Sequence, residues 1–195
     1  MRSDAHQSRM RTAAVLSAGA VMIGGLPLVT ATSSQAAPLT PTVSAKASVA
    51  QAKKSKAQKK RAKRLRQKKR ANRARSSLVR VSLNQLGKQY VAGAAGPNRF
   101  DCSGFTQYVY KKATGKYLPH YSGAQMNRTR RVGVKWLKPG DLLFYGRGGS
   151  QHVSMYIGKG KMIHATNPRT DVRIDRVNNG YWRGRFAGAG RIIEG

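Results

Sequence analysis

Short apolar runs and glycine-rich turns alternate along residues 78–195, which is the pattern of one small folded domain. The segment is long enough to bury one hydrophobic core, and it contains no internal repeat. Three runs rich in aliphatic and aromatic residues, bounded by turn residues, predict strands. These runs are residues 141–145, 152–157 and 162–166. The last two predict a β-hairpin, because only a short glycine-containing turn separates them.

A helix is predicted before these strands. Apolar residues recur at helical spacing from Phe105 to Ala113, Asp101 is a typical N-cap residue, and Gly115 is a typical residue at a helix end. The helix therefore begins at about Cys102. Together, the helix and the hairpin predict a domain that contains both α and β structure.

The first 36 residues have the layout of an export signal. Three arginines lie within residues 1–11, an apolar stretch runs from Thr12 to about Thr30, and Ser34 and Ala36 are the small residues that a signal peptidase requires. We expect cleavage after Ala36. The alternative is an uncleaved membrane anchor, but glycines and a proline interrupt a stretch that is barely long enough to cross about 30 Å of hydrocarbon. No stable membrane span is therefore predicted.

Residues 37–77 form a basic arm, in which Ala, Lys, Arg, Gln and Ser dominate. From residue 38 onward the arm contains 15 Lys or Arg and no acid. Like charges three and four positions apart repel one another on a helix, so we expect a disordered or transiently helical segment. It is either a solvated spacer or a segment that adheres to a polyanion.

The charge of the chain restricts its partners. The formal net charge is +32, and residues 78–195 alone carry 20 Lys or Arg against five acids. The ligand of the domain is therefore expected to be acidic. An exported chain would meet teichoic acids, anionic lipid headgroups or wall carboxylates, so nucleic acid is not the expected partner.

Cys102 is the only cysteine of the chain, which excludes an intramolecular disulfide. A lone cysteine is often a buried structural residue that packs as a small hydrophobic side chain. Its predicted position at a helix N-terminus favours another role, because unpaired amides and the helix dipole there stabilise a thiolate and lower the cysteine pKa. Cys102 is thus a candidate nucleophile.

A thiol nucleophile needs a base, and three histidines follow the apolar N-terminal stretch: His120, His152 and His164. With a two-residue turn, His152 and His164 would lie on opposite faces of the sheet. With a three-residue loop or a bulge at Gly160, Ser154 faces His164 and both imidazoles lie on one face as diagonal neighbours. We predict the second arrangement, in which His164 orients His152.

Two other interpretations fit these residues. A strand histidine is often a half-buried packing residue. One cysteine and two histidines could also be three ligands of a catalytic zinc. Neither a histidine pair at short helical spacing nor a fourth ligand near the motifs supports a metal. No metal and no other cofactor is therefore predicted.

Four segments resemble, in order and spacing, the motifs of the NlpC-type cell-wall cysteine peptidases. These segments are residues 100–105 (FDCSGF), 136–144 (WLKPGDLLF), 152–158 (HVSMYIG) and 162–165 (MIHA). The resemblance extends over about residues 78–193 and excludes the basic arm. It implies an α+β, papain-like fold, in which the helix that carries the cysteine packs on an antiparallel sheet that carries the histidines.

The resemblance also implies the catalytic roles. Cys102 would be the nucleophile, His152 the general base and then the general acid, and His164 the residue that orients the imidazole of His152. Tyr90 corresponds to the family tyrosine beside the oxyanion site, where the Cys102 amide would be the second donor.

Three further residues match positions that line the substrate site in this family. Asp101 and Ser103 resemble residues that bind the free amino end of a short wall peptide, although helix capping alone would also explain both. His120 is expected to line the site without a catalytic role. The family usually has a bulky aromatic residue and two glycines after its tyrosine, whereas this chain has VAGAA at positions 91–95. This difference affects the expected substrate preference more than the chemistry.

The expected function is that of a secreted, wall-associated hydrolase that cuts peptidoglycan stem peptides. By resemblance, the favoured bond joins D-glutamate to diaminopimelate or its lysine equivalent. One alternative is an N-acetylmuramoyl-L-alanine amidase on the same fold. The other is a basic wall-binding module without activity, against which the intact set of one cysteine and two histidines argues.

Overall fold

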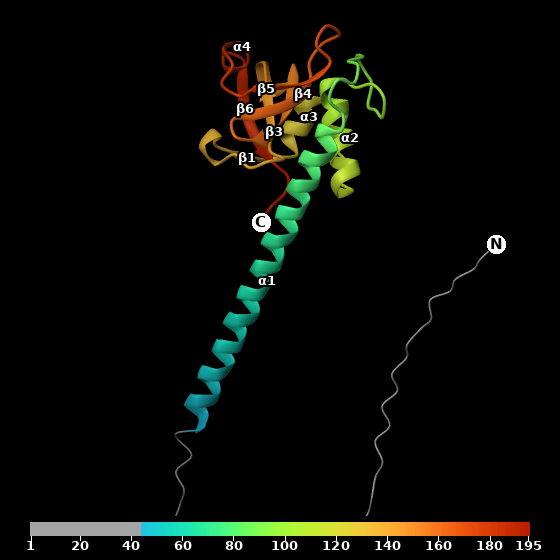
Figure 1. The fold of residues 1–195 in the computed structure, drawn as a ribbon. Helices are drawn as coiled ribbons and strands as arrows, with labels where there is room; N and C mark the ends of the chain where they lie inside the picture. The colour runs from blue at the N-terminus through green and yellow to red at the C-terminus, as the bar shows by residue number, and fades with distance from the viewer. Residues whose placement is uncertain (1–43) are drawn as a thin grey trace, which may run out of the picture. The chain divides into compact units, whose positions relative to one another are not determined.

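A computed structural model describes residues 44–195, so the predicted signal peptide and the beginning of the arm lie outside the described residues. The helices are α1 (Ser44–Leu83), α2 (Cys102–Thr114), α3 (Ser122–Asn127) and α4 (Gly180–Arg183), and the 3-10 turns are η1 (Val134–Trp136) and η2 (Arg147–Gly149). The strands are β1 (Arg130–Val132), β2 (Leu142–Tyr145), β3 (His152–Gly158), β4 (Lys161–Ala165), β5 (Val172–Arg176) and β6 (Phe186–Arg191). Figure 1 shows the long α1 leading into a domain of short helices and strands.

One antiparallel sheet, with strand order β1-β6-β2-β3-β4-β5, forms the centre of the domain. The three strands predicted from the sequence are present as β2, β3 and β4, and α2 begins at Cys102 as predicted. α2 packs against β3 and β4. Buried side chains such as Phe105, Val109, Phe144 and Met155 form the main core. Burial of these apolar groups is what fixes the helix on the sheet.

The β3–β4 hairpin contains the predicted bulge, which lies at the end of β3 and not at Gly160. Met155 pairs with Ile163, and the register shifts between Tyr156 and Gly158. This bulge puts Ser154 opposite His164, because pairing continues one residue further along each strand. The sequence prediction for this hairpin is therefore confirmed.

The described part of the basic arm, residues 44–77, lies within the continuous helix α1, whereas disorder or transient helicity was expected from its like charges. The described α1 side chains before Ala71 are exposed, and burial begins at Ala71. Ala71, Leu78 and Val81 then pack in the main core. The packing of the domain thus extends back beyond residue 78, because the last turns of α1 present small and apolar residues to α2.

A buried ion pair joins the start of β2 to β6. The Arg191 guanidinium donates two hydrogen bonds to Asp141, at 2.8 Å to Oδ1 and 2.6 Å to Oδ2, and both side chains are buried. Such bidentate pairs fix geometry as well as contributing energy. The Arg75 side chain lies close enough for its charge to act on Arg191, and it donates to the Ile193 carbonyl.

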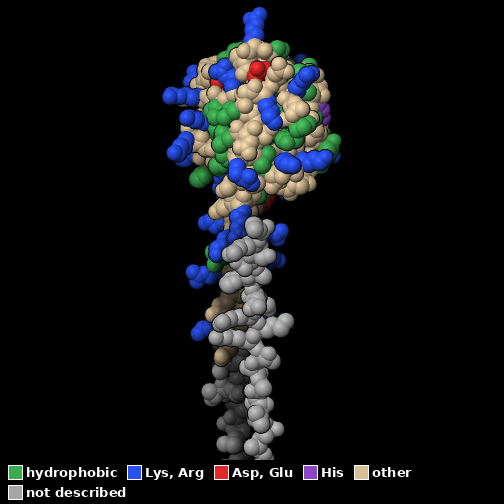
Figure 2. All heavy atoms as spheres, turned by 45° about the vertical axis from the view of Figure 1, so that its right-hand side comes forward, with side chains coloured by type: hydrophobic (Ala, Val, Ile, Leu, Met, Phe, Trp, Pro, Cys, Tyr) green, Lys and Arg blue, Asp and Glu red, His purple; other side chains and the backbone are tan. Residues whose placement is uncertain are grey.

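The surface of the domain is strongly basic. Figure 2 shows Lys and Arg side chains spread over the visible face, with few Asp or Glu side chains among them. Among residues 44–195, no helix is long and apolar enough to cross a membrane.

Candidate active site

The N-terminus of α2 carries Cys102. Asp101 caps the helix, since its Oδ1 accepts a 2.6 Å hydrogen bond from the Gly104 amide. Gly104 is needed because the loop before the helix passes very close. A Cβ at this position would lie 2.2 Å from the Ala94 carbonyl oxygen and 2.9 Å from Nε2 of His120. A small residue here thus lets the loop and His120 close around the helix start.

Burial raises the pKa of the Cys102 thiol above its ordinary value. The negative charge of Asp101 acts in the same direction, whereas the amides of Val153, Ser103 and Cys102 itself lower this pKa and do not compensate for burial. The amides at the helix N-terminus lower this pKa as expected, but the net shift is upward, so the expectation of a depressed cysteine pKa is wrong. The physical reason is that removal of a thiolate from water costs more than the hydrogen bonds from these amides return.

The sulfur of Cys102 nevertheless lies against β3, an interior strand of the sheet that carries the histidines. The Val153 amide is a hydrogen-bond donor to this sulfur, and Val153 directly follows His152 in β3. The structure thus brings the predicted nucleophile and the predicted base to the same place. This contact between α2 and β3 is the central feature of the site.

His152 and His164 form the predicted pair. Nε2 of His152 lies 2.8 Å from Nδ1 of His164, and Nε2 of His164 lies 3.2 Å from Oδ2 of Asp175. A carboxylate only accepts, so His164 carries its proton on Nε2 and its Nδ1 accepts from His152. His152 then has a proton on Nε2 and a free lone pair on Nδ1. That nitrogen is the one that the predicted general base would use.

Both histidines are held neutral by their surroundings. Burial lowers the pKa of His152 and of His164, and for His152 the neighbouring His164 acts in the same direction. Asp175 opposes these effects in both cases. The hydrogen bond from His164 is the main reason why the pKa of Asp175 falls to about 2. The resting site therefore contains a thiol, two neutral imidazoles and one carboxylate.

Two residues of this arrangement were not identified from the sequence. Asp175 lies on β5, where it pairs with Met162 and is a diagonal neighbour of His164. Trp182 lies on α4, where its ring stacks on His152 with centroids 4.6 Å apart and its Nε1 donates to Asp175 at 3.2 Å. The register of β5 could have indicated Asp175, but no sequence pattern connects the tryptophan to the histidines.

Tyr90 lies beside the cysteine, as the resemblance implies. Its backbone amide donates to Oδ1 of Asp171 at 2.9 Å, which anchors the tyrosine to the loop before β5. Burial raises the pKa of the Tyr90 hydroxyl, and the charges of Cys102 and Asp101 raise it further. The phenol is thus a neutral donor close to the sulfur.

The three proposed substrate-lining residues are already bonded to one another. Oδ1 of Asp101 accepts from the Ser103 hydroxyl at 3.1 Å as well as from the helix, and its Oδ2 lies 2.7 Å from Nε2 of His120. Oδ2 also accepts from the Gly93 amide at 2.9 Å. Capping and loop closure therefore explain these contacts within the chain. A role in substrate binding stays a prediction.

The arrangement suits acyl transfer through a covalent intermediate, since it brings together the predicted nucleophile, a neutral imidazole as the predicted base and a second imidazole hydrogen-bonded to it. Residues 44–195 contain no group of three or more His, Cys, Asp or Glu side chains that could hold a metal ion.

Comparison with known proteins gives consistent results. The NlpC/P60 family matches residues 87–191 of the chain. The chain is 42% identical over 117 residues to the probable endopeptidase p60 of Listeria innocua, covering 60% of this chain and 24% of that protein. It is 38% identical over 113 residues to the peptidoglycan endopeptidase RipA of Mycobacterium tuberculosis, covering 51% of this chain and 24% of that protein.

Solved structures agree on the fold. The peptidoglycan hydrolase RipB of Mycobacterium tuberculosis superimposes with a TM-score of 0.57 at 32% identity, covering 64% of this chain and 67% of that chain. The predicted α+β, papain-like fold is therefore confirmed. The chain spans about a quarter of the length of the curated relatives that it matches.

Proposed function

This chain belongs to the NlpC/P60 family, and we propose that it is a cysteine peptidase that hydrolyses stem-peptide bonds of peptidoglycan. The observation that carries this proposal is the meeting of Cys102, at the start of α2, with the β3 strand that holds His152. The chain of hydrogen bonds from His152 through His164 to Asp175 supports it further, because it leaves an unprotonated nitrogen on His152.

The first half of the reaction forms a thioester. The Cys102 thiol gives its proton to Nδ1 of His152 as the sulfur attacks the amide carbon, and the carbonyl π electrons move to the oxygen. Because the resting pair is neutral, this proton transfer accompanies the attack. The Cys102 amide and the Tyr90 hydroxyl stabilise the oxyanion. The carbon–nitrogen bond then breaks as His152 protonates the leaving amine.

The second half releases the product. A water molecule gives a proton to the now neutral His152 while its oxygen attacks the thioester carbon. Collapse of this second tetrahedral intermediate breaks the carbon–sulfur bond, and His152 returns the proton to the sulfur. The ring of Trp182, stacked on His152, limits the access of bulk water to the base.

The substrate bond that we propose joins D-glutamate to diaminopimelate or its lysine equivalent. Stem carboxylates complement the basic surface of the domain. Asp101 would bind the free amino end of the peptide, with Ser103 and His120 beside it. In the diaminopimelate form, the residues on both sides of this bond carry a carboxylate. Charge complementarity with the basic domain therefore favours this bond as the substrate.

The proposed location is the cell wall outside the membrane. The export-signal layout of residues 1–36 supports secretion, and the basic arm supports adhesion to teichoic acids or other wall polyanions. The names of the p60 and RipA relatives describe endopeptidases, which agrees with a wall substrate. Nucleic acid is not the proposed partner.

The test is digestion of purified peptidoglycan fragments by the protein, followed by mass spectrometry of the products. Cys102→Ala is the inactive variant, and Lys112→Gln, an exposed change on α2, is the control for handling and folding. We expect cleavage at the D-glutamyl bond only when Cys102 is present. Fragments in which the sugar is separated from the first alanine would show an amidase instead. No cysteine-dependent product from fragments of either stem type would refute the peptidase.

A further inference from the structure

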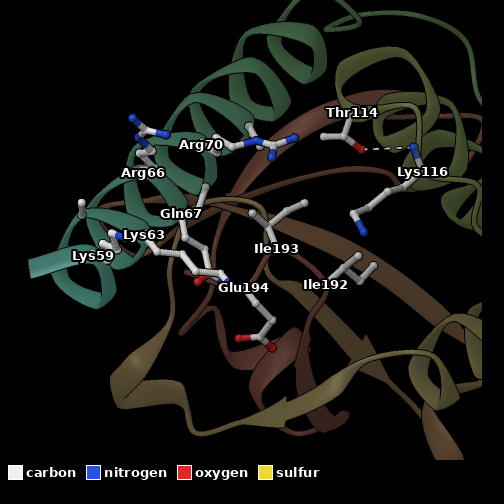
Figure 3. Close-up of a pocket in the computed structure, with 13 residues that line it drawn as sticks. Lys59, Lys63, Arg66, Gln67, Arg70, Thr114, Lys116, Ile192, Ile193 and Glu194 are labelled. Carbon is white, nitrogen blue, oxygen red and sulfur yellow. Dashed lines mark hydrogen bonds between the residues drawn. The ribbon is translucent and has the colours of Figure 1, made fainter. Parts of the chain in front are cut away.

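A groove outside the catalytic site lies between α1 and the C-terminal segment, and it has a volume of about 950 Å³. Figure 3 shows side chains from α1 on one side, with Lys116 and the C-terminal Ile192 and Ile193 opposite them. The lining residues are Lys59, Ala62, Lys63, Arg66, Gln67, Arg70, Ala71, Ala74, Thr114, Lys116, Ile192, Ile193 and Glu194.

The groove is strongly positive. Five of its described lining residues are Lys or Arg, and Glu194 is the one carboxylate among them. Arg130 already pairs with that carboxylate at 2.7 Å, so Glu194 does not neutralise the lysines and arginines of the groove. These cations have no acid in the arm to pair with, because residues 38–77 contain none. An occupant must therefore be an anion.

The positive charges of α1 are arranged in a row. Lys59, Lys63, Arg66 and Arg70 follow the i, i+4, i+7, i+11 spacing that puts residues on one helix face. At a rise of 1.5 Å per residue, the row extends over about 16 Å. A compact anion would reach one or two of these charges, whereas a linear polymer with a charge in each repeat can contact all of them.

The other lining residues indicate the chemistry of the polymer. Ala62, Ala71, Ala74, Ile192 and Ile193 give the groove an apolar surface between its charges, which suits the carbon atoms between neighbouring anionic groups. Arginine forks match phosphate oxygens. None of the described lining residues has an aromatic ring on which a nucleic-acid base could stack.

We propose that this groove binds a linear polyol phosphate, a chain of phosphodiesters without bases, and thereby ties the arm and the domain to the same polymer. The choice of polymer rests on the proposed wall location, but the site itself does not depend on the peptidase activity. Because Lys116 comes from the domain and the row of cations from the arm, the complete groove exists only where both parts are present.

The experiment measures binding of a synthetic glycerol phosphate oligomer to the full chain by isothermal titration calorimetry. Two matched pairs of lysine substitutions distinguish the groove from general basicity. Lys63→Gln and Lys116→Gln change lysines that line the groove. Lys60→Gln and Lys112→Gln change exposed lysines that do not line it. All four variants have the same charge.

We expect each groove variant to weaken binding about fivefold, as for one basic side chain at a polyanionic surface, and each control to weaken it less than twofold. Equal effects in all four variants would refute the groove and show diffuse attraction by the arm. Single-stranded DNA or polyglutamate that binds as tightly, with the same sensitivity to Lys116→Gln, would refute the proposed polymer.

Peptidase activity on soluble fragments separates this inference from the proposed function. Lys116→Gln is expected to keep wild-type activity, because the lysine lies in the groove and not among the residues around Cys102. Absence of Cys102-dependent cleavage by the wild-type protein would refute the peptidase and leave the groove to be judged by the calorimetry alone. Loss of cleavage in Lys116→Gln alone would refute the separation of the groove from the catalytic site.

Discussion

Replacing Asp175 by asparagine removes one charge from the far end of the hydrogen-bond chain that orients the base. Nε2 of His164 and Nε1 of Trp182 each lie 3.2 Å from the same oxygen, Oδ2. Both are donors, so the asparagine amide keeps these hydrogen bonds when its oxygen faces them, and its NH2 group then faces Arg173, whose Nη2 lies 2.7 Å from Oδ1 of Asp175. In that orientation the hydrogen bond from His164 is retained, while the acceptor becomes neutral and the ion pair with Arg173 is lost.

The size of the effect follows from the loss of that charge. A hydrogen bond to a charged group contributes about 1.5–3 kcal/mol and a neutral one about 1 kcal/mol, so the imidazolium that forms on His152 loses roughly 1–2 kcal/mol of stabilisation. At 1.4 kcal/mol per factor of ten, kcat should fall about tenfold. KM should change little, because Asp175 lies behind the base and does not face substrate.

The pH dependence gives a second, independent readout. The base must be neutral to act, and its depressed pKa keeps it neutral well below pH 6.5, so activity is lost only as pH falls through that lowered value. Asp175 raises the pKa of His152. Asp175→Asn should therefore move the acid limb of the kcat/KM profile to still lower pH.

The assay is steady-state cleavage of a soluble stem peptide between about pH 2 and 9, a range that includes the pKa of His152, which is lowered to about 3. Glu194→Gln, an equal change of charge at an exposed ion pair, is the control. A kcat/KM within twofold of wild type, with an unmoved acid limb, would refute the orienting role of Asp175. A shift of that limb to higher pH would refute the electrostatic argument.

Three further outcomes are expected. Alkylation of Cys102 by iodoacetamide should rise with pH to a midpoint above that of an ordinary thiol, because burial raises its pKa; a midpoint below about 8.5 would contradict this. Gly104→Ala should destabilise the protein by about 1–3 kcal/mol in urea unfolding, because the new Cβ would meet the Ala94 carbonyl; unchanged stability would mean that the loop moves freely. Asp141→Ala should cost about 3–5 kcal/mol in the same measurement, since it leaves the buried Arg191 without its charge partner; a loss below about 1 kcal/mol would show that water reaches the guanidinium.

The sequence by itself determined the local geometry of the site. Asp101 precedes apolar residues at helical spacing and Gly115 follows them, so these two residues mark the beginning and the end of α2. Cys102 is therefore at the N-terminus of this helix. The alternation of residues in β3 and β4 limits the hairpin to two registers, and the bulge seen in the structure selects the one in which His152 and His164 share a face. These features depend on the side-chain spacing along a helix or a strand, and that spacing is determined by residues that are close in the sequence.

Tertiary structure decided the properties that depend on distant groups. The stacking of Trp182 on His152 does not follow from any sequence period, because α4 reaches the site only through tertiary packing. The hydrogen bond that Asp175 accepts from His164 depends on the pairing register of β5 with β4. The direction predicted from the sequence for the Cys102 pKa shift was wrong for a similar reason. Every element that packs around the sulfur contributes to its burial, and the resulting rise in pKa exceeds the lowering by the one helix end that a sequence pattern reveals.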